Sequence, residues 1–264
     1  EPRRPQSRQV GVRRAQSHVP PHQVIELRVT GNKFDVGLAV GNLKPARAMG
    51  MTTIKVTGEA QLLADLSAAV RRRGGHLVVD EIYHGLGYEA STPSVLEVDP
   101  DAFVINSFSK YFGMTGWRLG WMVVPEDAIP NVEKLAQNLL ICPSTVAQRA
   151  ALAAFTPEAR TIMESQREAF AERRALLCRG LKELGFEIPI EPAGAFYVYA
   201  GLPGHLNMDS ETFCRELLEH QGIAITPGTD FGSYEADRYV RFSYANDMTA
   251  LNAALAGIAR FLGA

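Results

Sequence analysis

One lysine, Lys110, lies in a segment whose residue types suit covalent chemistry. Three aromatic residues flank it, at Phe108, Tyr111 and Phe112. Apolar surroundings disfavour the charged form of a lysine, so its amine can attack an aldehyde and form a Schiff base. A single lysine on a loop is more often a solvated surface residue, so this interpretation depends on what the neighbouring residues add.

The residues on either side of Lys110 suit a phosphate group. Ser107 and Ser109 place hydroxyl groups before the lysine, and Arg118 follows it eight residues later. A guanidinium offers a planar fork of donors that fits a phosphate dianion. The segment therefore combines an amine suited to an aldehyde with donors suited to a phosphate.

The motif Ser-Phe-Ser-Lys, followed by Gly-Met-Thr-Gly-Trp-Arg-Leu-Gly, resembles the lysine motif of class I/II aminotransferases. Members of this family are fold type I enzymes that use pyridoxal 5'-phosphate (PLP). The resemblance implies that Lys110 is the catalytic residue that forms a Schiff base with PLP. It also implies that Ser107, Ser109 and Arg118 bind the cofactor phosphate.

A second motif, Asp80-Glu81-Ile82-Tyr83, follows a short predicted strand at 76–79. A carboxylate just beyond a strand in an open α/β sheet lies where such sheets bind ligands, although an aspartate there is often only a turn residue. Asp-Glu-Ile-Tyr resembles the second signature of the same family. The resemblance implies that Asp80 pairs with the pyridine nitrogen of PLP and that Tyr83 donates to its phenolate oxygen. Both residues are thereby assigned catalytic and cofactor-binding roles.

Three motifs near the end of the chain, Pro-Ala-Gly-Ala-Phe-Tyr, Thr-Pro-Gly-Thr-Asp-Phe-Gly and Tyr-Val-Arg-Phe-Ser-Tyr-Ala, resemble the aminotransferase small domain. Arg241 alternates with Val240 and Phe242 in a predicted strand, a pattern that by itself indicates an exposed face. The resemblance instead implies that Arg241 binds the substrate α-carboxylate. A bidentate guanidinium fits a carboxylate and fixes the orientation of an amino acid.

The apolar periodicity predicts an α/β protein. Helical spacing indicates helices at 59–70, 126–140, 144–155, 157–184, 210–220 and 247–262. Short apolar runs indicate strands at 76–79, 102–105, 117–124, 187–190, 195–200, 223–226 and 239–244. With the resemblance, this pattern predicts a PLP-dependent transferase-like fold: a partial large domain with a mixed or parallel sheet, and an α+β C-terminal small domain.

The same reasoning divides the chain into three parts. Residues 1–58 match nothing in the family, hold an Arg- and Pro-rich start without periodicity, and are expected to be poorly ordered. Two apolar stretches within this part, 24–29 and 36–40, could pair as strands. Residues 59–156 are expected to form the partial PLP-binding domain, and residues 157–264 a connecting helix and the small domain.

Composition narrows the class of protein further. Apolar residues make up 46% of the chain and charged residues 21%, with a net charge of −2, which is ordinary for a soluble globular protein. Three widely separated cysteines favour reduced thiols and a cytoplasmic location. We expect no metal site, no nucleic-acid partner and no membrane span, because ligand spacing, interleaved basic and aromatic residues, and an apolar run of about 18–20 residues are all missing.

The chain also departs from the family pattern. Counting back about 28 residues from Asp80, where the resemblance places an Asn-Pro motif, leads to Thr-Thr-Ile-Lys at 52–55. We find no counterpart of the aromatic that stacks on PLP, nor of the glycine loop that binds its phosphate. We therefore expect the first elements of the large domain to be missing, leaving sheet edges and helix faces uncovered. PLP binding, the family's homodimer contacts and activity should all suffer.

The resemblance implies transamination between an L-amino acid and a 2-oxo acid. The retained residues would equally serve another fold type I enzyme, such as a lyase or decarboxylase. A PLP-binding but non-catalytic remnant is a further alternative. An effector-sensing domain of a regulator is a fourth, although residues 1–50 show no helix-turn-helix pattern.

Overall fold

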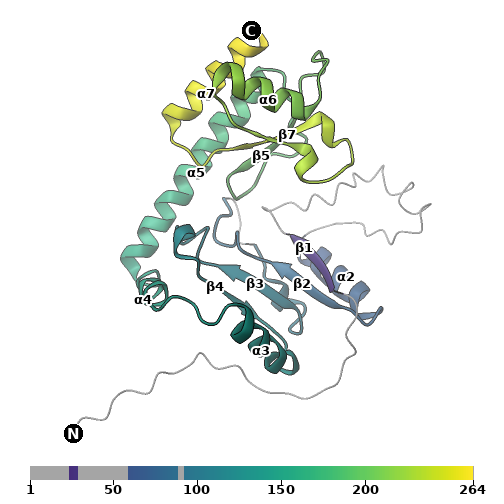
Figure 1. Ribbon diagram of the computed structural model, residues 1–264, viewed down its shortest axis with the longest axis vertical. Helices are drawn as coiled ribbons and strands as arrows, with labels where there is room; N and C mark the ends of the chain where they lie inside the picture. The colour runs from purple at the N-terminus through teal and green to yellow at the C-terminus, as the bar shows by residue number, and fades with distance from the viewer. Residues whose placement is uncertain (1–23, 29–58, 89–91, 264) are drawn as a thin grey trace. The chain divides into compact units, whose positions relative to one another are not determined.

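The computed structural model of the protein describes residues 24–28, 59–88 and 92–263 (Figure 1). These residues fall into two compact units. Unit 1 holds residues 24–28, 59–82 and 93–154, and unit 2 holds residues 83–88, 92 and 155–263. The expectations about order in 1–23 and 29–58, and about a strand at 36–40, concern residues outside the described part.

Unit 1 is built on a four-stranded sheet with the order β1-β2-β3-β4. Its strands are β1 (Val24–Arg28), β2 (His76–Asp80), β3 (Phe103–Ser107) and β4 (Gly120–Val123). The first three run parallel and β4 is antiparallel to β3, so the sheet is mixed, as expected. Residues 24–28 of the first apolar stretch form β1, which pairs in parallel with β2.

Helix α2 (Glu59–Arg71) covers part of this sheet with the predicted apolar stripe. Leu62, Leu63 and Val70 are buried, and the helix ends shortly before Gly74, whose φ of +67° suits glycine. Near its C-terminus, α2 is hydrogen-bonded to Asp99 in the loop before β3. The buried carboxylate of Asp99 accepts hydrogen bonds from Ser67 at 2.5 Å and from Arg71.

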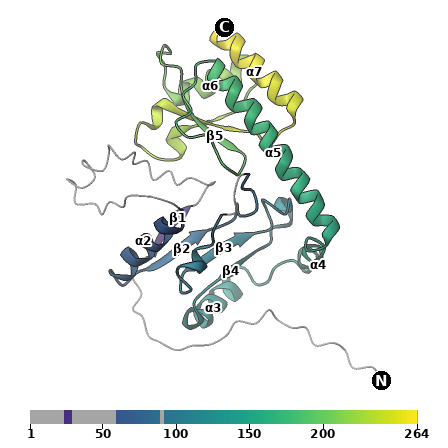
Figure 2. The same ribbon diagram turned by 180° about the vertical axis from the view of Figure 1, so that it is seen from behind.

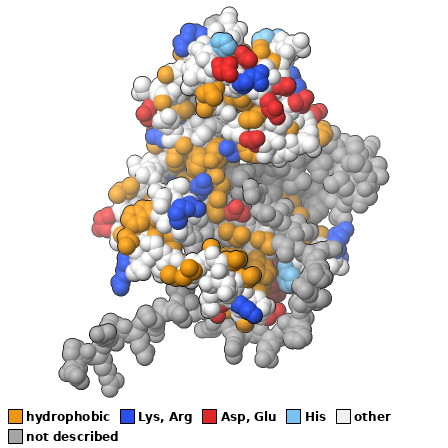
Figure 3. Space-filling model, in the orientation of Figure 1, with side chains coloured by type: hydrophobic (Ala, Val, Ile, Leu, Met, Phe, Trp, Pro, Cys, Tyr) orange, Lys and Arg blue, Asp and Glu red, His pale blue; other side chains and the backbone are white. Residues whose placement is uncertain are grey.

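After β4 the chain forms a 3₁₀ turn, η4 (Glu126–Ala128), then α3 (Ile129–Leu139) and α4 (Thr145–Ala153). Much of the apolar surface of these helices is exposed, including Leu139 at 75% and Leu152 at 65%, and so is Ile141 between them, at 81%. Trp121 and Met122 of β4 are also exposed, and hydrophobic side chains gather at this surface in Figure 3. Within the described residues, apolar helix faces are thus exposed, as expected, and β4 is the last strand in the order of the sheet.

Unit 2 begins with the long helix α5 (Pro157–Glu183) and continues through β5 (Tyr197–Gly201), α6 (Ser210–Gln221), β6 (Thr226–Pro227), β7 (Tyr239–Ser243) and α7 (Met248–Leu262). The strands form an antiparallel sheet of order β5-β7-β6. The three helices pack on one face of this sheet (Figures 1 and 2). Unit 2 is therefore an α+β arrangement, as predicted.

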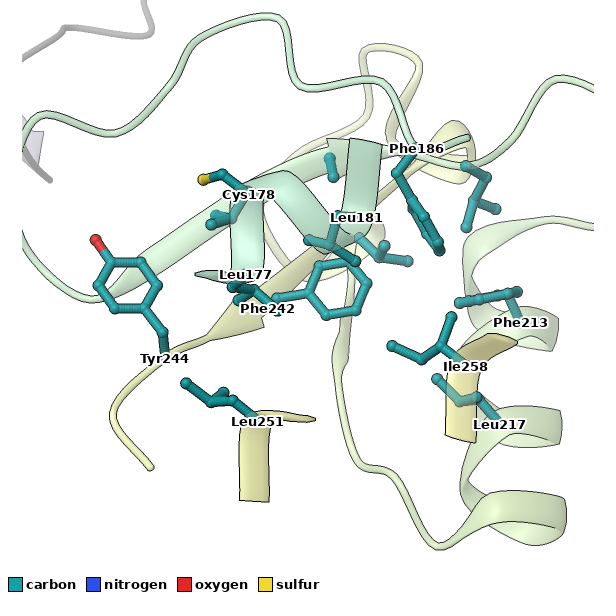
Figure 4. Close-up of a cluster of buried hydrophobic side chains, with 14 residues drawn as sticks. Leu177, Cys178, Leu181, Phe186, Phe213, Leu217, Phe242, Tyr244, Leu251 and Ile258 are labelled. Atoms are coloured by element: carbon teal, nitrogen blue, oxygen red, sulfur yellow. The ribbon is translucent and has the colours of Figure 1, made fainter. Parts of the chain in front are cut away.

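The core of unit 2 lies between that sheet face and the helices (Figure 4). Alternation along the strands sends Val198, Val240 and Phe242 into this core, where each is almost completely buried. Leu181 of α5, Phe213 of α6 and Ile258 of α7 meet them there. The residues that alternate with the core set, among them Arg241, consequently lie on the opposite face of the sheet.

Side-chain caps fix the beginnings of the helices in unit 2. The hydroxyl oxygen of Thr156 accepts from the Ala159 N–H at 3.2 Å, with Pro157 at the first helical position of α5. Asp209 caps α6 and Asp247 caps α7 in the same way, at 2.7 and 2.8 Å. These capping residues explain why the predicted helix starts agree closely with the structure.

Three predicted strands need correction. The strand predicted from Trp117 begins only at Gly120, because Thr115–Trp117 form a 3₁₀ turn and Arg118 has a φ of +53°. No strand forms at 187–190: Glu187 makes one bridge with Gly201, and Pro189 has no N–H to extend the pairing. At 223–226 only the last residue pairs; Ile223 and Ile225 pack against the core instead.

The helical spacing at 157–184 places Ile162 on the apolar face of that helix, but in α5 this residue is 61% exposed. Within the described residues, no helix combines the length and apolarity that crossing a membrane requires. In that same part of the chain, no group of three or more His, Cys, Asp or Glu residues could hold a metal ion. Cys142, Cys178 and Cys214 are free thiols, and burial raises the pKa of Cys178 to about 11.

Candidate active site

Lys110 lies in the hairpin that joins β3 to β4. The hairpin is closed where the Phe108 N–H donates to the Leu119 carbonyl at 3.1 Å and the Met114 N–H donates to the Phe108 carbonyl at 2.9 Å. The Gly113 N–H donates to the carbonyl of Lys110 itself at 3.0 Å, and Gly113 has the φ of +66° that favours glycine. The backbone of the lysine is thus fixed in a tight turn.

An apolar cluster supports this hairpin. Phe108 and Met114 are buried and pack with Ala151 of α4. The Phe108 ring centroid lies 4.8 Å from that of Phe112 and 5.1 Å from that of Trp121. Lys110 itself is half-buried. The aromatic residues on either side of Lys110 in the sequence therefore pack with one another and with Trp121 of β4.

The proposed phosphate donors lie at the base of the same hairpin. The hydroxyl oxygens of Ser107 and Ser109 are 2.8 Å apart, and Ser107 also donates to the Leu119 carbonyl at 3.2 Å. Arg118 is exposed, and its Nη1 donates to the Thr115 carbonyl at 3.0 Å. Within the described ranges, no carboxylate lies at ion-pair distance from Arg118, so its remaining donors can serve an anion.

Asp80 ends β2 beside the strand that leads into this hairpin. β2 and β3 are parallel neighbours with Asp80 opposite Ile105, so their carboxyl ends share one edge of the sheet. One oxygen of Asp80 accepts from the Ile82 N–H at 3.1 Å, which directs the chain away from the sheet. The structure thus brings Asp80, Lys110 and the three proposed phosphate donors to the same edge of unit 1, where open α/β sheets bind ligands.

The glycines of the lysine motif differ in their structural roles. Gly113 has a turn conformation with positive φ, whereas a β-carbon on Gly116 would meet no described atom within 4 Å. The close backbone approach occurs at Gly120, where a β-carbon would lie 2.7 Å from the Asn106 carbonyl oxygen. The last glycine of Trp-Arg-Leu-Gly is therefore the one that lets β4 pair tightly with β3.

Tyr83 and Arg241 belong to unit 2. The ring of Tyr83 lies edge-on to Phe196, with centroids 5.7 Å apart. Arg241 is half-buried on the face of the sheet opposite the core, and its Nη2 lies 3.5 Å from the Thr226 hydroxyl. In the part of the chain that the structure describes, Arg241 has no carboxylate partner.

The sequence did not lead us to predict two residues that contact Arg241. The guanidinium carbon of Arg241 lies over the ring of Tyr197 at 4.2 Å and over the ring of Phe231 at 4.5 Å. Such cation–π contacts hold a guanidinium by its faces and leave its N–H edge available. Both aromatics lie in motifs that resemble the family, Pro-Ala-Gly-Ala-Phe-Tyr and Thr-Pro-Gly-Thr-Asp-Phe-Gly, which was the signal available.

Comparison with known proteins identifies the family of this chain. The family model for class I and II aminotransferases matches residues 57–258. The chain belongs to this family, and its resemblance to it is confirmed.

Individual relatives agree with this assignment. A valine–pyruvate aminotransferase from Mycobacterium tuberculosis is 41% identical over 188 residues, which are 70% of this chain and 48% of that protein. A (5-formylfuran-3-yl)methyl phosphate transaminase from Methanocaldococcus jannaschii is 37% identical over 190 residues, covering 71% and 50%. The chain thus spans about half the length of the curated relatives it matches.

Solved structures show the same fold. An aminotransferase from Mycobacterium tuberculosis aligns with a TM-score of 0.72 and 39% identity, over 76% of this chain and 52% of that one. An aspartate aminotransferase from Thermotoga maritima aligns with a TM-score of 0.69 and 32% identity, over 79% and 53%. The expected α/β, PLP-dependent transferase-like fold is confirmed.

Proposed function

We propose that this chain carries the cofactor-binding and substrate-binding residues of a PLP-dependent aminotransferase acting on an L-amino acid and a 2-oxo acid. The observation that carries the proposal is the hairpin between β3 and β4. It holds Lys110 beside the paired hydroxyls of Ser107 and Ser109, at the sheet edge where Asp80 ends β2. Family membership supports the reaction class.

The donor set of unit 1 fits PLP. Ser107, Ser109 and Arg118 offer hydroxyl and guanidinium donors for a phosphate dianion, and Arg118 has no described carboxylate that would compete. The carboxylate of Asp80 would hold a proton on the pyridine nitrogen. When bound, PLP supplies an electron sink for the charge left at the substrate Cα after deprotonation.

The protein's own residues would bind, orient and move protons. Lys110 would hold the aldehyde carbon of the cofactor through its Nζ and afterwards carry the proton between the substrate Cα and the cofactor, a general acid–base role. Tyr83 would donate its hydroxyl proton to the phenolate oxygen of the cofactor. Arg241 would bind the substrate carboxylate with the N–H edge that its aromatic neighbours leave available.

We further propose a cytoplasmic location, from the three free cysteines, and a homodimer, from the family. We also propose that this chain alone binds PLP weakly. Its phosphate donors are three side chains, and we found no glycine loop, Asn-Pro motif or stacking aromatic. Two or three absent charge-assisted hydrogen bonds, at about 1.5–3 kcal/mol each, correspond to several orders of magnitude in affinity.

The direct test is a PLP titration of the purified chain followed by an assay of amino donors. Because one relative is named for valine and pyruvate, valine and pyruvate are the first substrate pair to assay. Aspartate and 2-oxoglutarate are the second. We expect PLP-dependent transamination that is slow and lost in Lys110→Ala. Lys134→Ala, at an exposed position of α3, is the matched control and should retain it.

The products distinguish the alternatives. Carbon dioxide release instead of amino transfer would indicate a decarboxylase, and PLP binding without any product would indicate a non-catalytic remnant. Turnover that persists in Lys110→Ala would contradict the proposal.

A further inference from the structure

The paired strands β5 and β7 of the unit 2 sheet place Tyr197 and Arg241 on the same face. Tyr199 of β5 is directly opposite Arg241 of β7, and Tyr197, two residues along β5, shares the face of Tyr199. Tyr197 is therefore the diagonal neighbour of Arg241, a position within reach of an aromatic side chain. The other face carries the core residues, so this pair lies outside the core.

The Tyr197 ring makes contacts in two directions. The guanidinium carbon of Arg241 lies 4.2 Å from the centroid of this ring. The ring of Tyr83 lies edge-on to it, with centroids 6.3 Å apart and planes inclined at 75°. Tyr197 thus touches both residues that unit 2 contributes to the proposed site, although they are far apart in the chain.

The hydroxyl of Tyr197 has no part in these contacts. Among the described residues it makes no hydrogen bond, whereas its ring contacts Arg241, Tyr83 and Phe196. The interaction with Arg241 is a cation–π contact and that with Tyr83 is an edge-to-face aromatic pair, and both depend on the ring. Any positioning role therefore belongs to the ring and should survive replacement by phenylalanine.

Phe231 and Phe196 each contact only one of the two partners of Tyr197, Arg241 or Tyr83. Phe231 lies against Arg241, at 4.5 Å from the guanidinium carbon, and has no described ring contact with Tyr83. Phe196 contacts Tyr83 but not the guanidinium. The two phenylalanines are thus natural controls for the two sides of Tyr197.

We propose that Tyr197 is a positioning residue that fixes Arg241, the proposed substrate-carboxylate ligand, relative to Tyr83, the proposed cofactor contact. The inference rests on the proposed function for the roles of those two residues. The link itself is a property of unit 2 and exists without cofactor or substrate. Removing the Tyr197 ring should therefore disturb both residues together, whereas removing the Phe231 ring should disturb Arg241 alone.

The test uses NMR of the full chain without PLP. The Arg241 Nε–H signal, assigned with Arg241→Lys, reports on the rings beside the guanidinium through their ring currents. The ring signal of Tyr83, observed with ¹³C-labelled tyrosine and assigned with Tyr83→Phe, reports on its own surroundings. We expect Tyr197→Leu to shift both signals, Phe231→Leu to shift only that of Arg241, and Tyr197→Phe to leave both close to their original positions.

A shift of only one signal in Tyr197→Leu would overturn the proposal, as would equal disturbance by Tyr197→Phe. Unchanged backbone signals of α6 show that the variants remain folded. If Tyr197→Leu does not fold, nuclear Overhauser effects in the unaltered chain decide: Tyr197 ring protons should be close both to the Arg241 side chain and to the Tyr83 ring. Absence of either proximity would contradict the link.

Adding pyruvate to the same samples tests the proposed function separately. A response of the Arg241 signal to pyruvate supports carboxylate binding, and no response argues against it. Neither result alters the comparison of Tyr197 and Phe231 variants, so failure of the proposed function and failure of the positioning role are distinguishable.

Discussion

The hydroxyl oxygens of Ser107 and Ser109 lie 2.8 Å apart at the end of β3, and the Ser109 N–H donates to the Ser107 oxygen at 3.0 Å. This pair is fixed by the backbone of the turn that carries Lys110. Two hydroxyls held this way need little reorganisation to donate to an anion, which is the kind of preorganisation that strengthens binding.

The first prediction concerns this pair. Ser109→Ala should weaken binding of PLP about tenfold or more, since one hydrogen bond to a charged group is worth about 1.5–3 kcal/mol. Pyridoxal, which lacks the phosphate, is the matched control ligand and should bind both proteins equally. Dissociation constants measured by absorbance titration give the comparison. An equal loss for the two ligands would place Ser109 away from the phosphate.

The second prediction concerns the pH dependence of stability in unit 1. Burial alone would raise the pKa of the Asp99 carboxyl, but hydrogen bonds from Arg71 and Ser67 outweigh it and hold the pKa below its usual value. A depressed pKa adds stability above about pH 4 that is lost as the pH falls through the folded-state pKa. Acid should therefore destabilise unit 1 partly through this carboxylate.

Asp99→Asn should lower the free energy of unfolding at pH 7 by about 1–3 kcal/mol and flatten its dependence on pH below about 5. This loss of unfolding free energy is smaller than that for breaking a fully buried ion pair, because Arg71 is half exposed. Asp101→Asn, which removes the exposed second partner of Arg71, should change stability by less than about 0.5 kcal/mol. Urea unfolding at pH 7 and at about pH 3 is the measurement, because the loss occurs below the unfolded-state pKa. A larger effect from Asp101 would refute the assignment.

The third prediction concerns Gly194, which precedes β5. A β-carbon on this residue would lie 2.8 Å from the Leu86 carbonyl oxygen, and Gly194 also bridges to Gly87. Gly194→Ala should push this segment apart and destabilise unit 2 by about 1–3 kcal/mol. Gly204→Ala, where a β-carbon meets nothing within 4 Å, should be close to neutral. Thermal unfolding of the two variants would disprove the prediction if both lost equal stability.

The fourth prediction concerns two exposed apolar residues, one at the end of α3 and one just beyond it. With Leu139 at 75% and Ile141 at 81% exposure, the chain should self-associate as its concentration rises. Leu139→Glu with Ile141→Glu should reduce that association. Gln137→Glu with Asn138→Glu adds the same charge at neighbouring exposed polar positions and should have a smaller effect. Sedimentation velocity measures both; identical behaviour of the two double variants would mean that charge alone is responsible.

Periodicity and capping residues predicted the helices well. Pro157 and the apolar stripe located α5, and Asp247 located the start of α7, because these signals act within a few residues of each other. The strands at 187–190 and 223–226 were predicted wrongly. A strand needs a pairing partner, and in the second of these stretches only Thr226, where β6 begins, pairs with β7. The apolar residues there are buried without pairing.

The site could be predicted only in part for a similar reason. Lys110, Asp80 and Arg241 stand in motifs specific enough to be found from one sequence. The ring of Tyr197 could not be connected with Arg241 and Tyr83, because the contacts depend on the register of β5 against β7 and on the return of the chain from Tyr83. No local sequence pattern predicts that these three side chains are in contact. The assigned roles of the site residues themselves stay predictions.

The central claim is that Lys110 binds PLP covalently. The direct measurement is to incubate the chain with PLP, reduce with borohydride, digest, and identify the labelled peptide by mass spectrometry. The account predicts a single main label on Lys110, accompanied by a visible absorbance band before reduction, and loss of both in Lys110→Ala but not in Lys134→Ala. A main label on Lys134 or Lys182 would contradict it.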